Sequence, residues 1–366
     1  MNENAKETPE LRFERLRQKL LRVDTKDLNH ILEHTSHLWD EVRGQNIFIT
    51  GGTGYFGCWL LESFTWVNDQ LGLGAQATVL SRNPEAFVAK APHLANHPSV
   101  HLVQGDVQTF KFPAGEFRFV IHAATDASAK LNQENPLLMF DTIVEGTRRT
   151  LEFARTHGTC KFLFTSSGAV YGKQPPEMTH IPEDHLGAPD PMDPGAAYGQ
   201  GKWAAEALCR LYSHHFGLET KIARCFAQVG PYLSMDIHYA MGNFIRDALE
   251  GDSIHVNGDG SPLRSYLYAA DLAIWLWTIL LKGQSCRPYN VGSDRSVSIA
   301  ELANIVRQQI APNNKVIIAR QANTTEQRQR YVPSIERARR ELMLESWISL
   351  EESIRKTACW LKDQKA

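Results

Sequence analysis

Residues 46–57 read NIFITGGTGYFG, and this stretch decides the fold. Residues 46–50 have the length and apolar composition of a buried β-strand. They run directly into three glycines at three-residue spacing, Gly51, Gly54 and Gly57, and a helical pattern follows over 58–67. Strand, glycine turn and helix in this order let a diphosphate approach the backbone and rest on the helix N-terminus, where free N–H groups favour an anion. The stretch therefore predicts a dinucleotide-binding βαβ unit.

The segments that follow repeat this alternation of strand and helix. Helical patterns over 137–156 and 198–216 separate short apolar runs of strand length. Strands that alternate with helices form βαβ units, and these units build a parallel sheet. We therefore predict an α/β fold of the Rossmann type with a doubly wound parallel sheet. Its strands are expected at 46–50, 77–80, 100–103, 117–122, 161–165 and 221–226.

The sequence changes in character on both sides of this region. Residues 1–43 carry apolar residues at helical spacing among charged ones, which predicts an N-terminal helical extension. The Rossmann domain is expected over 44–227. Turns rich in proline and glycine follow, and residues 228–366 are expected to form mainly a smaller C-terminal α/β substrate-binding lobe. One strand and one helix near 266–295 should return to the Rossmann domain.

The composition is that of an ordinary globular protein. Of the 366 residues, 43% are hydrophobic and 22% are charged, and the formal net charge is −2 at pH 7. With no basic run in the chain, we expect neither nucleic acid nor a membrane as a partner. The most apolar run, 272–281, is shorter than the ~20 residues of a spanning helix. The first ten residues are polar, unlike a signal peptide, so we expect a cytoplasmic protein.

Cysteine and histidine show no spacing typical of a disulfide framework or a metal centre. The six cysteines include no CxxC pair, which predicts free thiols in a reducing compartment. His93, His97 and His101 lie close together, but no carboxylate or cysteine stands beside them at ligand spacing. We therefore expect no metal site.

A second group of residues indicates proton transfer. Tyr198 and Lys202 open the helix expected over 198–216 and share one face because they are four residues apart. A free tyrosine has a pKa of about 10, and a nearby ammonium group favours the phenolate, bringing the pKa toward the working range. Ser167 ends the preceding strand, where its hydroxyl can hydrogen-bond a reacting oxygen. We predict Tyr198, Lys202 and Ser167 as the catalytic set.

The end of the second expected strand bears on the choice of cofactor. A site for NAD usually places an acidic residue there, which binds the ribose 2′-hydroxyl. This chain has Ser81 and Arg82 instead, and a hydroxyl with a guanidinium suits a 2′-phosphate. We therefore expect NADP. If Arg82 only faces solvent, NAD is the alternative.

Together these motifs resemble an extended short-chain dehydrogenase/reductase of the NAD-dependent epimerase/dehydratase family. The resemblance covers residues 45 to about 355, nearly everything but the N-terminal extension. It is carried by TGGTGYFG (50–57), GDV (105–107), HAAT (122–125), SSGAVYG (166–172), Tyr198-x-x-x-Lys202, RCF (224–226) and RSYLYAADL (264–272).

The resemblance implies roles for residues that spacing alone does not assign. It implies that Asp106 and Val107 flank the adenine and that Lys202 also holds the nicotinamide ribose. Arg264 and Asn243 would contact the diphosphate of a nucleoside-diphosphate sugar, and a fork of guanidinium donors suits that group. A plain ion pair of Arg264 with a nearby carboxylate is the alternative. The expected cofactor-binding residues are Gly51, Thr53, Gly54, Tyr55, Phe56, Gly57, Ser81, Arg82, Asp106, Val107, Ala123, Ala124, Thr125, Tyr198 and Lys202; the expected substrate-binding residues are Ser167, Asn243 and Arg264.

Departures from the family pattern narrow the expected chemistry. The 4,6-dehydratases of the family carry an acidic pair, or at least a glutamate, just before Val-Tyr-Gly, where this chain has Gly168 and Ala169. Dehydration and glutamate-assisted decarboxylation are therefore not expected. Ile143 and Ala227 stand where family members commonly have asparagine, which leaves the usual substrate contact at Ala227 in doubt.

These observations favour an NADP(H)-dependent 4-ketoreductase of a nucleotide-activated sugar. A dTDP-4-keto-6-deoxyhexose, reduced for surface polysaccharide synthesis, is the concrete expectation, and the family implies a homodimer. An NAD-dependent nucleotide-sugar 4-epimerase is the alternative. A non-catalytic dinucleotide-sensing protein is a more remote one, because a sensor needs no Ser167–Tyr198–Lys202 set.

Overall fold

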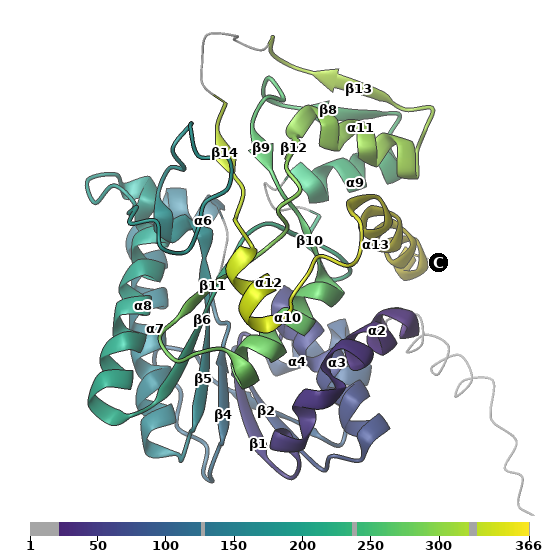
Figure 1. Cartoon of the computed structure of the whole chain (residues 1–366). Coiled ribbons are helices and arrows are strands. Elements are labelled where there is room, and N and C mark those ends of the chain that lie inside the picture. The colour runs from purple at the N-terminus through teal and green to yellow at the C-terminus, as the bar shows by residue number, and fades with distance from the viewer. Residues whose placement is uncertain (1–21, 126–128, 236–239, 322–327, 366) are drawn as a thin grey trace, which may run out of the picture.

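The centre of the computed structural model is a parallel sheet; the described residues are 22–125, 129–235, 240–321 and 328–365. Within them the sheet has seven strands in the order β11-β6-β5-β4-β1-β2-β3 (Figure 1). The order reverses between β1 and β4, the switch point at which open α/β sheets bind ligands. The strands are β1 (Asn46–Thr50), β2 (Gln76–Ser81), β3 (Val100–Gln104), β4 (Phe119–His122), β5 (Lys161–Ser167), β6 (Glu219–Cys225) and β11 (Pro288–Val291). The doubly wound Rossmann-type fold expected from the sequence is confirmed.

Helices cover both faces of this sheet because its strands are apolar on both sides. Ile47 and Ile49 of β1 face one core, and Phe48 between them faces the other. The first core is closed by α2 (Thr25–Thr35), η1 (Ser36–Val42), α3 (Tyr55–Leu71), α4 (Pro84–Lys90), α5 (Pro92–Ala95) and α10 (Ala269–Lys282). The second is closed by α7 (Pro136–Thr156) and α8 (Ala197–Phe216), which lie side by side in Figure 1. The short helices α6 (Ala129–Glu134), η2 (Gly168–Tyr171) and η3 (Pro194–Ala196) lie in the connections.

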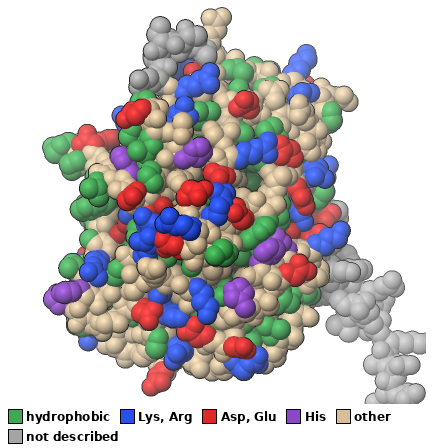
Figure 2. Space-filling model, in the orientation of Figure 1, with side chains coloured by type: hydrophobic (Ala, Val, Ile, Leu, Met, Phe, Trp, Pro, Cys, Tyr) green, Lys and Arg blue, Asp and Glu red, His purple; other side chains and the backbone are tan. Residues whose placement is uncertain are grey.

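A late segment of the chain completes the sheet. Strand β11 pairs in parallel with β6, and Pro288 stands opposite Ile222. The apolar run 272–281 lies inside α10, whose residues from Ala269 to Leu281 are all buried. None of the described helices is long and apolar enough to cross a membrane. On the face shown in Figure 2, basic and acidic side chains are interspersed, in keeping with the small net charge.

The remaining elements form a lobe beside the C-terminal ends of the strands (Figure 1). Its core joins α9, α11 and α13 through buried residues such as Phe244, Leu302 and Ile354. Two short strands, β7 and β10, pair with each other and lead from the sheet into the lobe. The lobe and its connections contain β7 (Gln228–Val229), α9 (Ala240–Glu250), β8 (Ser253–Val256), β9 (Leu263–Arg264), β10 (Leu267–Tyr268), β12 (Val297–Ser298), α11 (Ile299–Ile310), β13 (Lys315–Ile318), β14 (Arg330–Tyr331), α12 (Glu336–Leu342) and α13 (Leu350–Lys365).

The helix α2 contacts two elements from the C-terminal part of the chain, α10 and α13. It packs on α10, and its buried Asp27 accepts hydrogen bonds from the Tyr268 hydroxyl at 2.7 Å and from Lys356 Nζ of α13 at 2.8 Å. Burial raises the pKa of Asp27, and these two donors oppose that rise. The described part of the predicted N-terminal extension therefore packs on the main body. Residues 1–21 lie outside the described residues.

Candidate functional site

The glycine turn after β1 forms a cradle that only glycine permits. Gly51 has φ +73°, and a Cβ there would lie 2.4 Å from the carbonyl carbon of Ala123. A Cβ on Gly57 would lie 2.3 Å from the backbone of Gly52. Gly54 caps α3 without a side-chain hydrogen bond to the first-turn N–H groups. The backbone is thus open to an anion at the helix N-terminus, and it fits the pyrophosphate of a dinucleotide.

The other predicted cofactor residues follow β2, β3 and β4, so the parallel sheet brings them to the same edge. Ser81 Oγ accepts a hydrogen bond from the Asn83 backbone at 3.2 Å, and Asp106 Oδ1 accepts one from the Gln108 backbone at 2.9 Å. Arg82 is exposed, and no described residue forms a hydrogen bond or ion pair with its guanidinium. These contacts leave Arg82 available for a ligand.

The glycine turn contributes its backbone more than its side chains. The Thr53 carbonyl accepts a hydrogen bond from Lys90 Nζ at 2.9 Å. Phe56 packs against the core beneath the sheet. The Tyr55 hydroxyl is buried, close to where a Cβ on Gly230 would lie (3.3 Å). The structure therefore places the side chains of Tyr55 and Phe56 in packing positions, while their backbone forms the first turn of α3.

Lys202 of α8 contacts the end of β5 and the segment that follows β4. Its Nζ donates to the Thr165 carbonyl and to Thr125 Oγ1, each at 2.8 Å. The same atom lies 5.8 Å from the ring centre of Tyr198, one turn earlier on α8. Burial lowers the pKa of Lys202 to about 8, because desolvation disfavours its charge. Tyr198 and Lys202 thus lie on one helix face, with Thr125 holding the ammonium group.

Ser167 ends β5 with its hydroxyl at the same edge. Its Oγ accepts the Ala169 backbone N–H at 3.2 Å and lies 3.4 Å from the Tyr331 hydroxyl. Tyr331 belongs to β14 in the C-terminal lobe, about 160 residues away, and the sequence analysis missed it. No local motif marks it. Only the pairing of β14 with β9, which sets Tyr331 opposite Arg264, brings it to the site.

The predicted diphosphate contacts lie in the lobe. Arg264 is half-buried, and its Nη1 donates to the Leu263 carbonyl at 2.8 Å. No described carboxylate pairs with it, so the described residues offer no partner for the plain ion pair given as the alternative. Burial lowers the pKa of Arg264, while Tyr266 and Tyr331 nearby oppose this. Asn243 lies in the first half of α9, half-buried, and no recorded contact joins it to Arg264.

Gly168, in the segment before Val-Tyr-Gly, is closed to any side chain. A Cβ on Gly168 would lie 2.5 Å from Phe226 Cζ, and the Phe226 ring packs on the Tyr331 ring with centroids 4.5 Å apart. Ala169 carries no ionisable group. The buried carboxylate Glu183 is nearby in sequence, but its Oε1 already accepts the Asn290 backbone N–H at 2.9 Å. Aromatic rings therefore occupy the place of a side chain at Gly168, the first of the two positions where the family pattern has acidic side chains, and Ala169 has only a methyl group at the second.

The model of the NAD dependent epimerase/dehydratase family matches residues 47–292 of this chain. The chain belongs to this family. The glycine cradle, Lys202 and Ser167 all lie within the matched range. The predicted family and the expectation of an enzyme of this class are confirmed, and membership implies a nicotinamide dinucleotide cofactor, which the glycine cradle fits.

Named relatives and solved structures agree with this membership. The chain is 30% identical to UDP-glucuronic acid decarboxylase 1 of Danio rerio over 313 residues, 86% of this chain and 72% of that protein. The UDP-glucose 4-epimerase of Thermotoga maritima, solved with UDP-glucose, is 21% identical with a TM-score of 0.74, over 88% of this chain and 100% of that one. The dTDP-glucose 4,6-dehydratase of Bacillus anthracis, solved with NAD, is 20% identical with a TM-score of 0.70, over 88% and 97%. These structures share the fold.

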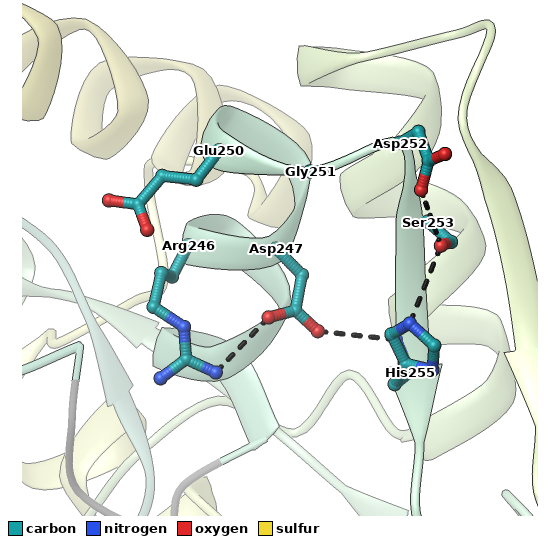
Figure 3. A pocket seen from close by; sticks show the side chains of 7 residues that line it. All are labelled: Arg246, Asp247, Glu250, Gly251, Asp252, Ser253 and His255. Carbon is teal, nitrogen blue, oxygen red and sulfur yellow. Dashed lines mark hydrogen bonds and ion pairs between the residues drawn. The ribbon is translucent and has the colours of Figure 1, made fainter.

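Two of the histidines that lie close together in the sequence contact single carboxylates on α3. His93 and His97, which have no acidic neighbour in the sequence, contact Glu62 at 2.7 Å and Asp69 at 3.1 Å, both on α3. Among the described residues, no group of three or more His, Cys, Asp or Glu side chains could hold a metal ion. A polar surface hollow of about 250 Å³ lies between α9 and β8 (Figure 3). Asp247 in it already binds Arg246 and the His255 backbone, and none of its lining residues belongs to the predicted site.

Proposed function

We propose that this enzyme is an NADP(H)-dependent 4-ketoreductase of a nucleotide-activated sugar. A dTDP-4-keto-6-deoxyhexose used for surface polysaccharide is our specific candidate. The observation that carries the proposal is the aromatic cover over Gly168: the site keeps the residues for hydride chemistry and lacks those for elimination. The named relatives, whose names give UDP and dTDP sugars as substrates, support a nucleoside-diphosphate sugar as substrate.

The three predicted catalytic residues suffice for reduction of a C4 ketone. The bound dinucleotide supplies the hydride, and the ketone oxygen must then gain a proton. The Tyr198 hydroxyl donates that proton, and the Lys202 ammonium stabilises the phenolate that remains. Ser167 Oγ hydrogen-bonds the same oxygen and orients it toward Tyr198. Arg264 would hold the diphosphate through charge-assisted hydrogen bonds.

Elimination of water would need groups that the described residues of this site do not provide. One group must take the C5 proton and another must protonate the departing hydroxyl. Gly168 and Ala169 can do neither, and the Phe226 ring fills the space beside them. Glu183 is bound to Asn290, and burial raises its pKa. The chemistry that remains is hydride transfer at a carbonyl or carbinol carbon.

Cofactor choice separates this proposal from its nearest alternative. Arg82 is exposed and unpaired with any described residue, which favours a 2′-phosphate and hence NADP. The family description names NAD, and a retained NAD would suit a nucleotide-sugar 4-epimerase, which oxidises C4 and reduces it again. The same Tyr198, Lys202 and Ser167 would serve both reactions. Identifying the dinucleotide carried by the purified protein discriminates between them.

We also propose a homodimer. Large apolar side chains are exposed on the paired helices α7 and α8, at Leu137, Leu138, Trp203 and Leu211. A second copy packing there would remove them from water. Sedimentation of the purified enzyme with and without Trp203→Lys tests this; a monomer in both cases contradicts it.

The decisive experiment uses two assays on one preparation. With dTDP-4-keto-6-deoxyglucose, we expect loss of NADPH absorbance. With dTDP-glucose or UDP-glucuronic acid at high enzyme concentration, we expect no 4-keto product and no release of carbon dioxide. A robust keto signal or decarboxylation would refute the proposal, since carboxylates from elsewhere would then have to reach the sugar.

A further inference from the structure

Behind the predicted catalytic face lies an ion pair that the mechanism above does not use. Glu206 is one turn beyond Lys202 on α8, so Tyr198, Lys202 and Glu206 follow each other at four-residue spacing on one helix face. The Glu206 side chain is only 10% exposed. A charged group at this depth is costly unless it is paired, so its partners indicate what it does.

Glu206 joins three elements of the site. Its Oε1 accepts a hydrogen bond from Ser166 Oγ at 2.5 Å, and Ser166 immediately precedes Ser167 at the end of β5. Arg224 of β6 binds both carboxylate oxygens, with Nε at 3.0 and 3.2 Å and Nη2 at 2.7 Å. Arg224 and Ser166 stand opposite each other in the β5–β6 ladder. The carboxylate thus connects α8 to the ends of two strands.

Arg224 is itself held from several sides. Its guanidinium lies 4.7 Å from the ring centre of Tyr171 and donates to the Glu183 carbonyl at 3.1 Å. The Tyr171 hydroxyl donates to Asn290 of β11 at 2.8 Å. These contacts leave Glu206 and Ser166 little room to move relative to the sheet.

Glu206 also acts electrostatically on Lys202, one helical turn earlier. The ionisable groups that face Lys202 are Tyr198, Glu206 and Cys209 on α8, Cys225 on β6 and His122 on β4. Burial lowers the pKa of His122 to about 3 and raises the pKa values of both thiols, so these three are neutral near pH 7. Among the described groups facing Lys202, Glu206 is then the negative charge, and it opposes the desolvation of the ammonium group.

We propose that Glu206 is a positioning residue: it fixes the Ser166–Ser167 end of β5 against α8, and its charge, balanced by Arg224, keeps Lys202 protonated. The inference rests on the proposed role of Lys202 in the reaction. No hydrogen bond or ion pair of the described residues joins Glu206 to Ser167, so Glu206 acts on the catalytic set through Ser166 and through its charge beside Lys202.

Substitutions of Glu206 and of Arg224 should shift the titration of Lys202 in opposite directions, and this provides a test. Glu206→Gln removes the negative charge and should lower the pH at which Lys202 titrates. Arg224→Gln leaves Glu206 unbalanced and should raise it. A unit charge one helical turn away, screened as in a protein interior, moves a titration by roughly one pH unit or more. Glu206→Asp and Arg224→Lys keep the charges and serve as matched controls.

Lys202 is followed directly by NMR of protein labelled at lysine Cε, with its resonance assigned by its loss in Lys202→Met. The alkaline limb of kcat should move in the same directions. If the Lys202 titration shifts in the same direction in both Gln variants, or in neither, the proposal is overturned. Either outcome is what an ion pair with a purely structural role would produce. Opposite shifts in the lysine signal without 4-ketoreductase activity would support the inference and count against the proposed function instead.

A third variant covers the case in which the Gln variants do not fold. Ser166→Ala removes only the hydroxyl that Glu206 binds, and the charges stay. We expect an unmoved Lys202 titration, an unchanged KM and a kcat lowered roughly 10–150-fold, the size of one hydrogen bond to a charged group. An unchanged kcat in this variant would contradict the positioning role.

Discussion

Replacing Gly168 with alanine should destabilise the protein by about 1–3 kcal/mol, the usual cost of overpacking a filled core. The added Cβ would lie 2.5, 2.7 and 2.8 Å from Cζ, Cε1 and Cε2 of Phe226, whereas carbon atoms in contact are ~3.5–4.0 Å apart. The ring must therefore withdraw by about 1 Å. It is 5% exposed and packed against the Tyr331 ring at an interplanar angle of 37°, so it cannot withdraw without disturbing that contact.

Thermal unfolding measures this cost. In a chain of this size, 1–3 kcal/mol corresponds to a fall in Tm of roughly 1–4 °C. Gly258→Ala is the matched control, because a Cβ there meets nothing within 4 Å and its φ is not left-handed. The double variant Gly168→Ala/Phe226→Leu should recover part of the loss relative to Phe226→Leu alone, since the clash has gone. A Gly168→Ala protein as stable as wild type would refute the claim that Phe226 closes this position.

Three further predictions concern single side chains. Tyr198→Phe should leave dinucleotide binding intact and lower turnover by roughly 10²–10⁴-fold, because only the proton donor is lost; turnover close to wild type would contradict its role. Arg82→Ala should weaken NADPH binding by roughly 1.5–3 kcal/mol and leave NADH nearly unchanged in a fluorescence titration, and equal losses for both would favour NAD. Burial lowers the pKa of His122 to about 3, so between that pH and ~6.5 the unfolded state binds the extra proton and stability falls as the pH falls. The Tm of His122→Asn should decline less steeply than that of wild type from pH 6.5 to 4.5; parallel curves would count against this assignment.

Local patterns predicted the parts of the molecule that depend on neighbours in sequence. The strand at 46–50, the glycine turn and the Tyr198–Lys202 spacing are each set within a few residues, and the structure has them in place. Tyr331 beside Ser167 and Phe226 over Gly168 depend on chain segments that pair across the fold. Without knowledge of the β14–β9 pairing, nothing in the short polar segment around Tyr331 indicates that this tyrosine lies at the site.

The partners of Glu206 illustrate the same limit. In the sequence, Glu206 lies within a regular helical pattern, where a glutamate is normally expected on the solvent-exposed face. Its burial follows from Arg224 and Ser166 on adjacent strands, a juxtaposition that sheet order creates. Likewise the acidic partners of His93 and His97 come from α3, some thirty residues earlier.

The contact of Asp27 with Lys356 has a consequence for biosynthesis. The two residues are 329 positions apart, so at ribosomal speeds of 5–20 residues per second about 15–70 s pass between their synthesis. During that interval α2 can pack on α10 once that helix has been made, but Asp27 lacks the ammonium group of Lys356 that pairs with it in the finished core. The pairing of Asp27 therefore has to wait until α13 has left the ribosome, and until then the buried carboxylate of α2 has no cationic partner from that helix.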